Sequence, residues 1–141
     1  MASSHKSNFH FIAEWGGSRT DFLEISGLSI ETEILEYRDG ASPDVIIKTP
    51  GQKKYANLVL RRMIKKGDSE FYTWMNTAQG SSVLKRNVII KLLNKKNERV
   101  MSWKAANAWP VKFEAADLKG NANEVAFETL ELTHDGLTFV N

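Results

Sequence analysis

Three histidines are the residues of this sequence best suited to metal binding or acid–base chemistry: His5, His10 and His134. No two of them have a metal-ligand spacing, and a zinc site normally takes three or four ligands. His134 precedes Asp135, but adjacent residues of a strand point to opposite faces, so these two side chains do not orient each other. A turn at Asp135-Gly136 explains the pair better than an acid–base site does.

An acidic group, Glu31, Glu33 and Glu36, could in principle supply a glycosidase-like pair of carboxylates. Glu31 and Glu33 share one face of an expected strand, about 7 Å apart. No aromatic platform for a sugar surrounds them in the sequence. A solvated sheet face is therefore the favoured interpretation.

Basic residues are numerous in two stretches and could bind phosphate. They are interleaved with apolar strand residues, and no glycine loop of the phosphate-cradling kinds is present. Lysines beside a β-prone run such as Asn87–Leu93 also prevent unwanted edge pairing. The formal net charge of +2, from 19 basic and 17 acidic residues, gives no electrostatic case for a nucleic-acid binder. The stretches comprise Arg61, Arg62, Lys65 and Lys66, then Lys85, Arg86, Lys91, Lys95 and Lys96.

The absence of cysteine removes disulfides, thiolate metal sites and cysteine nucleophiles. The sequence thus predicts no catalytic residue, no metal and no cofactor. The first residues lack the apolar stretch of a signal peptide, and no run approaches the ~18 apolar residues of a membrane span, so no membrane anchor is expected. Residues 1–8 are expected to be a flexible lead-in.

Alternating apolar and polar residues, separated by turn residues, predict β-strands along most of the chain. Gly16-Gly17-Ser18 breaks an opening hairpin, and the polar residues 94–98 join a later one. The proline of Trp109-Pro110 places its strand at a sheet edge or a strand start. The apolar phase switches between Phe127 and Leu130, which indicates a bulge or a strand buried on both faces. The expected strands are Phe9–Trp15, Phe22–Ile25, Ser29–Tyr37, Lys54–Met63, Asn87–Leu93, Arg99–Trp103, Asn107–Phe113, Val125–Thr133 and Leu137–Val140.

One helix is expected after the Lys54–Met63 strand. Asp68 or Ser69 can cap it, Glu70 suits its first turn, and Gly80 can end it. A helix of about 10–12 residues is marginal alone, so its apolar stripe must dock on a sheet. The stripe consists of Phe71, Trp74, Met75 and Ala78.

The Ser29–Tyr37 strand is expected to have two unlike faces. Ile30, Thr32 and Ile34 share the face that can pack into a core, and the carboxylates reach water on the other.

The next segment, Arg38–Lys53, is rich in turn residues, and Pro50-Gly51 suits the centre of a type II turn. A connection of this length is usually functional or disordered, and the β-branched run Val45-Ile46-Ile47 argues against disorder. We expect an arm that projects from the body and docks elsewhere.

These observations predict a mainly β protein of two packed antiparallel sheets, forming a β-barrel-like domain with one short flanking α-helix and a long extended loop or arm. The length of 141 residues fits one domain, expected over residues 9–141. Large apolar groups in nearly every strand favour a filled core over a small-ligand-binding barrel, which remains an alternative. A single-stranded nucleic-acid-binding β domain is the other, and would need a basic groove with exposed aromatics.

Residues spread from about Phe9 to Phe139 resemble a known family in their order and spacing. The resemblance is to the tail-tube proteins of contractile-tail bacteriophages and of phage-derived injection machines. The residues that carry it are Gly27-Leu28, Glu31, Glu33, Glu36 to Gly40, Lys48 to Gly51, Lys54-Tyr55, Leu58, Leu60 to Arg62, Trp103 to Pro110, Asn123 to Ala126, Glu128, Leu130 to Leu132, His134 and Gly136-Leu137.

The resemblance implies a homo-oligomer in which hexameric rings stack into a hollow tube, inside a sheath and on baseplate and spike proteins. It implies delivery of a protein effector or phage DNA through a target envelope, and no enzymatic activity. It also implies assembly in the bacterial cytoplasm and a place in a phage tail or an injection particle that can be released from the cell.

Two sets of residues are expected to serve the assembly. Glu31 and Glu33 are candidates for the lumen wall, because they occupy a polar strand face. The arm is expected to contact a neighbouring subunit or ring and to be mobile in a free monomer. The expected interface residues are Tyr37, Arg38, Asp39, Gly40, Val45, Ile46, Ile47, Lys48, Pro50, Gly51, Lys54 and Tyr55.

Overall fold

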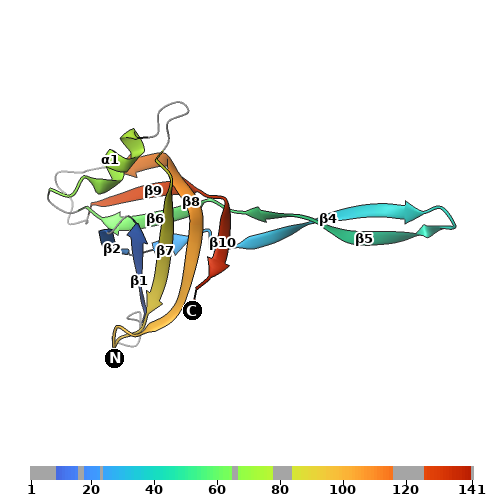
Figure 1. Cartoon of the computed structure of the whole chain (residues 1–141), viewed down its shortest axis with the longest axis horizontal. Helices are drawn as coiled ribbons and strands as arrows, with labels where there is room; N and C mark the ends of the chain where they lie inside the picture. Colours follow the sequence, from blue (N-terminus) through green and yellow to red (C-terminus); the bar gives the residue numbers. More distant parts are fainter. Residues whose placement is uncertain are drawn as a thin grey trace.

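A computed structural model describes residues 9–15, 18–22, 24–64, 67–77, 84–115 and 126–140. These residues form a body and a long two-stranded arm that leaves it on one side (Figure 1). The elements are β1 (His10–Trp15), β2 (Ser18–Phe22), β3 (Glu24–Ser26), β4 (Ile30–Asp39), β5 (Ser42–Tyr55), β6 (Leu58–Met63), α1 (Glu70–Asn76), β7 (Arg86–Leu93), β8 (Arg99–Ala115), β9 (Phe127–Thr133) and β10 (Gly136–Phe139).

The body is an antiparallel sheet in the order β2-β1-β7-β8-β9-β6-β3, with β10 also paired to β8. The long strand β8 divides it into two layers. Its first half pairs with β7 and β10, and its second half pairs with β9. We call β2, β1, β7, the first half of β8 and β10 the first layer, and the remainder the second layer. The predicted class, two packed antiparallel sheets with one helix, is confirmed, although the sheets share β8 and do not close into a barrel.

Asn107 marks the point where β8 passes from one layer to the other. Its φ of 51° lies in the left-handed region, which asparagine tolerates better than most residues. Pairing with β7 ends at Ala108, and pairing with β9 begins at Trp109. The sequence predicted two strands here, but β8 is continuous, since a single left-handed residue bends it without ending it. Pro110 pairs with Leu132 beyond the last β7 contact, as expected for a proline at a strand edge.

The opening hairpin is confirmed in part. Strand β1 pairs with β2, so its partner begins at Ser18. Ile25, predicted for the same hairpin strand, instead lies in β3 and pairs with Leu60 of β6. The chain therefore passes from the first layer to the second between β2 and β3.

An aromatic cluster fills the space between the layers. Trp15 packs against Phe22, Phe71 and Trp74 at ring-centroid distances of 5.9, 5.9 and 5.6 Å. Helix α1 covers this cluster with Phe71 and Trp74, which confirms these two positions of the predicted apolar stripe, while Met75 is half-buried. The helix has 7 residues, fewer than expected; Ala78 and Gly80 lie outside the described residues. Asp68 Oδ1 accepts a hydrogen bond from the Glu70 N–H, whereas the Ser69 side chain makes no cap.

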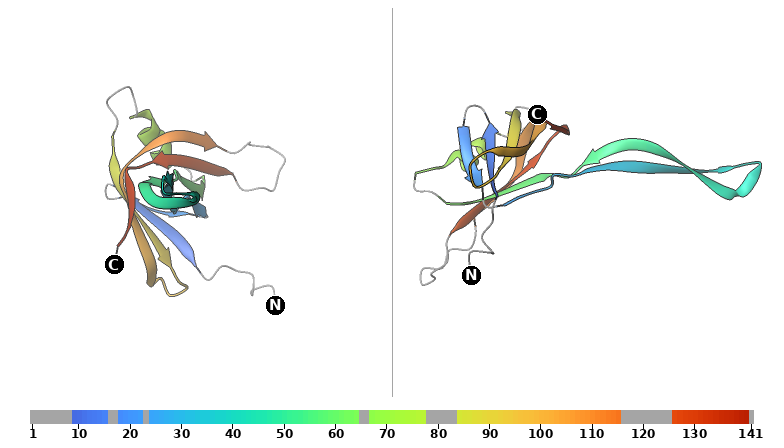
Figure 2. Two further views of the ribbon diagram at one scale, coloured as in Figure 1. Left: turned by 90° about the vertical axis from the view of Figure 1, so that its right-hand side faces the viewer. Right: turned by 90° about the horizontal axis from the view of Figure 1, so that it is seen from below.

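The arm is a hairpin of β4 and β5, which pair only with each other and turn at Gly40-Ala41. Every β4 residue except the half-buried Glu33 is exposed, so the predicted core face of Ile30, Thr32 and Ile34 is wrong. No second layer formed by the described residues lies over β4 to bury that face. Figure 2 shows the arm end-on at the left, and its right-hand view, from below, shows the arm standing apart from the layers of the body.

The predicted turn at Pro50-Gly51 is also wrong, because both residues lie within β5. Each strand of a two-stranded hairpin has an open edge, where a proline without an N–H is tolerated. The pairing of β4 with β5 shifts in register between Thr32 and Ile34, next to the position where Ile34 pairs with Pro50. The predicted Lys54–Met63 strand is interrupted at Ala56-Asn57, so Lys54 and Tyr55 belong to the arm and Leu58 onward to the body.

Candidate functional site: the arm and its root

The root of the arm is a crossing of two chain segments that only glycine permits. Gly27 lies between β3 and β4 with a φ of 92°. A Cβ at this position would lie 1.9 Å from the backbone oxygen of Asn57, which lies between β5 and β6. Both strands of the arm therefore leave the second layer through one close backbone contact.

Tyr55 anchors the arm to the body. Its ring lies 5.7 Å from that of His134, and it packs against the core. His134 Nε2 lies 3.1 Å from the carbonyl oxygen of Ala56, while the adjacent Asp135 accepts a hydrogen bond from Asn107 Nδ2 at 2.9 Å. His134 and Asp135 thus have separate structural partners, in agreement with the sequence argument against an acid–base pair.

The outer part of the arm has one apolar face. Tyr37 lies directly opposite Ile47, and Leu35 opposite Thr49. Val45 precedes Ile47 by two residues in β5 and therefore lies on the same side. We call Leu35, Tyr37, Val45 and Ile47 the apolar arm face.

The opposite side of the arm is mixed in character. Glu36 lies opposite Lys48, and Arg38 opposite Ile46. Opposite charges at directly paired positions stabilise a sheet modestly, by about 0.2–1 kcal/mol per pair. The hairpin is therefore amphipathic over its outer part.

An isolated two-stranded hairpin is marginally stable in water. On its apolar face, this one exposes 46% of Leu35, 54% of Tyr37 and 50% of Val45. Contiguous exposed apolar surface of this kind marks an interaction site. The arm is the candidate functional site of the molecule.

The structure brings all the predicted interface residues together on the arm. Tyr37 to Gly51 occupy its outer part, whereas Lys54 and Tyr55 lie at the root. Glu31, a predicted lumen residue, lies opposite Lys54 near the root. Glu33 lies at the register shift between β4 and β5. A Cβ added to Gly51 would lie 3.2 Å from the Cβ of Glu33.

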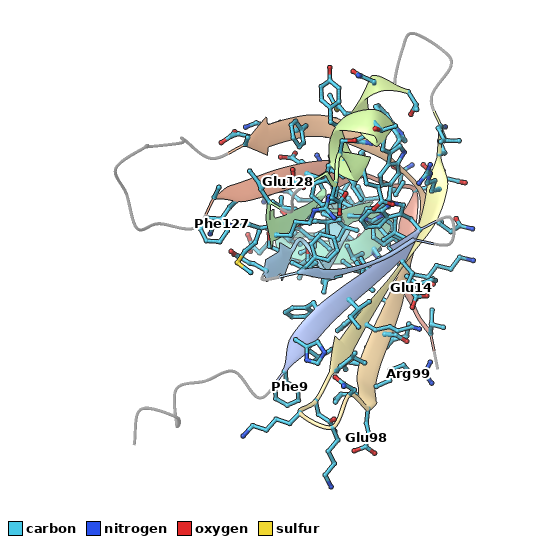
Figure 3. The ribbon with its side chains drawn as sticks, turned by 90° about the vertical axis from the view of Figure 1, so that its left-hand side faces the viewer. Phe9, Glu14, Glu98, Arg99, Phe127 and Glu128 are labelled. Atoms are coloured by element: carbon cyan, nitrogen blue, oxygen red, sulfur yellow. The ribbon has the colours of Figure 1, made fainter. Side chains whose placement is uncertain are left out.

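The sequence analysis missed a buried ion pair in the body. Arg62 is 1% exposed, and its Nε donates to Glu128 Oε1 at 2.7 Å. Its guanidinium also lies 3.2 Å from Asp68 and 3.9 Å above the Phe71 ring. Figure 3 shows Glu128 directed into the body, while its neighbour Phe127 lies at the edge.

This pair explains the apparent phase switch in β9. Glu128, Leu130 and Leu132 are all buried on one face, so no bulge is needed in the described part of that strand. The alternation of β6 could have revealed the buried arginine, because Arg62 continues the buried series of Leu58 and Leu60. A charged residue at a buried position of the alternation produces the same sequence pattern as a change of phase.

Several of the candidate phosphate-binding residues that the structure describes have separate structural partners. Arg61 pairs with Glu24, Lys91 pairs with Glu14, and Arg86 lies above the Trp74 ring. Lys65 and Lys66 lie outside the described residues.

Within the described ranges, no group of three or more histidine, cysteine, aspartate or glutamate residues could hold a metal ion. Over the same ranges, no helix has the length and apolar character needed to cross a membrane. An open groove lies on the outer face of the second layer, not between the layers. Its lining consists of Glu24, Val59, Arg61, Glu114, Phe127 and Thr129.

A body with a packed interior and an arm with an unpartnered apolar face define a structural protein that assembles with other chains. The T4-like virus tail tube protein gp19 family matches residues 7–138, and the chain belongs to this family of tube proteins of contractile tails and contractile injection systems. None of the curated proteins matches the chain.

Solved structures agree with the family. A chain of the sheath–tube complex of the PVC extracellular contractile injection system, in its extended state, is 30% identical, with a TM-score of 0.84 over 92% of this chain and 87% of that one. A chain of the baseplate of the anti-feeding prophage, 6-fold symmetrised, is 26% identical, with a TM-score of 0.77 over 96% and 93%. Hcp1 from Flavobacterium johnsoniae shares the fold at 14% identity, with a TM-score of 0.62 over 92% and 94%. The predicted tube function is confirmed, and the ligand-binding and nucleic-acid-binding alternatives are not favoured.

Proposed function

We propose that residues 9–141 act as one tail-tube domain that forms hexameric rings, and that these rings stack into a hollow tube. The tube lies inside a contractile sheath, stands on baseplate and spike proteins, and carries a protein effector or phage DNA through a target envelope. Assembly takes place in the bacterial cytoplasm, and the particle can be released from the cell. The chain catalyses no reaction.

The observation that carries this proposal is the exposed amphipathic arm. Head-to-tail contacts between identical chains generate rings when the rotation closes, and stacked rings can cover the remaining surfaces. Further support comes from the relative solved in a sheath–tube complex and from the relative solved in a baseplate with six-fold symmetry.

Purified protein tests the proposal directly. Size-exclusion chromatography with negative-stain imaging should show rings or tubes with six subunits per ring. A protein that stays monomeric over the micromolar range, or rings of another order, would contradict it.

Removal of the arm tests the role of the predicted interface residues. Deletion of Gly40 to Gly51 should leave a folded monomer that no longer polymerises. A cleaner variant replaces residues 33–52 with Asn-Gly, because Thr32 and Lys53 are cross-strand partners and Asn-Gly suits a two-residue turn. Normal tubes from either variant would contradict the proposal that the arm contacts a neighbouring subunit or ring.

Glu31 and Glu33 remain our proposed lumen residues. Charge reversal at both positions should change the passage of cargo or the lumen potential while tubes still form. Lys54→Glu, opposite Glu31, serves as a control for the local cross-strand charge. Burial of either carboxylate between subunits would exclude the role.

A further inference from the structure

The first layer carries an apolar face that continues past the core. Residues directly opposite one another in neighbouring strands share a face, so the strand pairing defines rows of side chains. One row, Val88, Ala105 and Leu137, is buried between the layers. In the next row, Ile90 is fully buried, whereas Trp103 of β8 and Phe139 of β10 are not.

Two rows of this face reach solvent. Phe139 lies opposite Trp103, and the ring centroids are 5.8 Å apart. Phe11, Leu92 and Met101 form the row after that. Phe139 is 63% exposed and Met101 41%, whereas the other three are half-buried. We call these five residues the uncovered face.

The uncovered face needs a partner. An apolar sheet face is stable when another layer covers it, and none of these five side chains carries a charge. The second layer and α1 stop short of it, and the first layer extends beyond them toward the turn between β7 and β8 (Figure 1). Figure 3 shows Phe9, Glu98 and Arg99 at this far end of the layer.

The chain itself offers a surface of matching chemistry. The apolar arm face has two aliphatic β-branched residues, a leucine and a tyrosine on a narrow hairpin. Glu36, Arg38 and Lys48, which alternate with these residues, lie on the other side of the hairpin, where they can stay in water. Since the arm extends away from its own body (Figure 1), the contact must come from a second copy. Residues 1–8, Met-Ala-Ser-Ser-His-Lys-Ser-Asn, offer only one large apolar side chain for the same purpose.

We propose that the apolar arm face of one copy packs onto the uncovered face of a neighbouring copy. This inference rests on the proposed tube function and identifies the surface that receives the arm. Each copy donates one arm and accepts one arm, so the contact is head-to-tail and can repeat from copy to copy.

Cross-linking tests the contact, and the absence of native cysteine makes each introduced thiol unambiguous. Copies carrying Tyr37→Cys are mixed with copies carrying Met101→Cys, assembled and oxidised; Ile47→Cys with Phe139→Cys is a second pair. A disulfide forms only when the Cα atoms approach within about 7 Å. We expect covalent dimers of the two unlike variants in the assembled fraction. The matched controls, Glu36→Cys on the other arm face and Lys104→Cys on the other face of β8, should give at least tenfold less.

The outcomes separate this inference from the proposed function. Tubes that form without the expected cross-links, or with equal cross-linking of the controls, overturn the inference and leave the tube intact. Failure of the unmodified protein to assemble overturns both.

Complementation gives a second test that does not depend on disulfide geometry. Tyr37→Asp damages the arm and leaves the uncovered face, whereas Phe139→Asp does the reverse. Each variant alone should stay monomeric. A one-to-one mixture retains one intact arm and one intact face, so it should yield dimers that grow no further by size exclusion. Thr138→Asp, next to Phe139 on the opposite side of β10, should assemble normally. Tubes from either damaged variant, or no dimer from the mixture at concentrations where the unmodified protein assembles, would refute the contact.

Discussion

Strand β9 in the body and strand β4 in the arm both alternate apolar and polar residues, but only β9 buries a face. Leu130 and Leu132 are fully buried, whereas Ile34 and Tyr37 are 61% and 54% exposed. Neighbouring strands and the opposite layer surround β9, while β4 has β5 alone. Alternation therefore determines which side chains point the same way, and the surrounding layers determine whether that side is covered.

The two regions also differ in the burial of their carboxylates. Glu128 in the body is buried against Arg62, whereas Glu36 in the arm is exposed opposite Lys48. A charge without a partner is costly in the first setting and inexpensive in the second. The body buries its charged and apolar groups against one another, whereas the arm leaves both kinds exposed.

The largest expected effect in this comparison comes from the buried pair. Glu128→Ala removes the carboxylate that lies 2.7 Å from the buried Arg62 guanidinium, and removal of one partner of a buried pair costs about 3–5 kcal/mol. Urea unfolding followed by circular dichroism measures this loss. Glu24→Ala breaks the exposed pair with Arg61, which is on the same strand as Arg62, and should cost at most about 1 kcal/mol. Equal losses for the two variants would show that burial does not separate the pairs.

Truncating one leucine in each region should separate stability from assembly. Leu130→Ala opens a cavity in the core and should lower the free energy of unfolding by about 2–5 kcal/mol. Leu35→Ala on the exposed arm should change monomer stability by about 0.5 kcal/mol or less. Only Leu35→Ala should impair tube formation under conditions where both variants are folded. The comparison would break if Leu35→Ala unfolded the monomer as strongly as Leu130→Ala.

Two glycines test the root of the arm against its tip. Gly27→Ala forces a left-handed backbone and a clash with Asn57, so a loss of about 1–3 kcal/mol is expected, together with poorer assembly. Gly40 has no positive φ, and a Cβ there would meet no atom within 4 Å. Gly40→Ala should therefore change stability by about 0.5 kcal/mol or less. Thermal unfolding of both variants checks the difference, and similar melting temperatures would argue against a fixed root.

The smallest energies concern the arm itself in the free monomer. Its backbone hydrogen bonds lie in a hairpin without a covering layer, so opening costs little. Hydrogen exchange followed by mass spectrometry should show fast exchange over residues 33–52 and slow exchange in β7 and β9. Assembly should slow exchange in the arm. Strong protection of the arm in the monomer would contradict its predicted mobility.

Sequence patterns predicted much of this fold where short-range geometry decides it. The period of two in Leu58, Leu60 and Arg62 orients β6, and Phe71 and Trp74 fall on one helical face whatever surrounds them. The segment Arg38–Lys53 indicated a projecting arm, although the turn it favoured, Pro50-Gly51, lies within β5. The resemblance then pointed to the tube family that the comparisons confirm.

The tertiary structure alone decided what covers each face. The sequence of β4 is compatible with a core strand, and it is exposed because no layer reaches it. In the sequence Glu128 resembles a solvent-facing residue, and only the fold places Arg62, 66 positions earlier, beside it. In the sequence Pro50-Gly51 resembles a turn, but pairing with β4 keeps both residues in the extended strand β5. Side-chain direction follows from local backbone geometry, whereas burial, ion pairing and the exposure of apolar faces depend on contacts between residues distant in the chain.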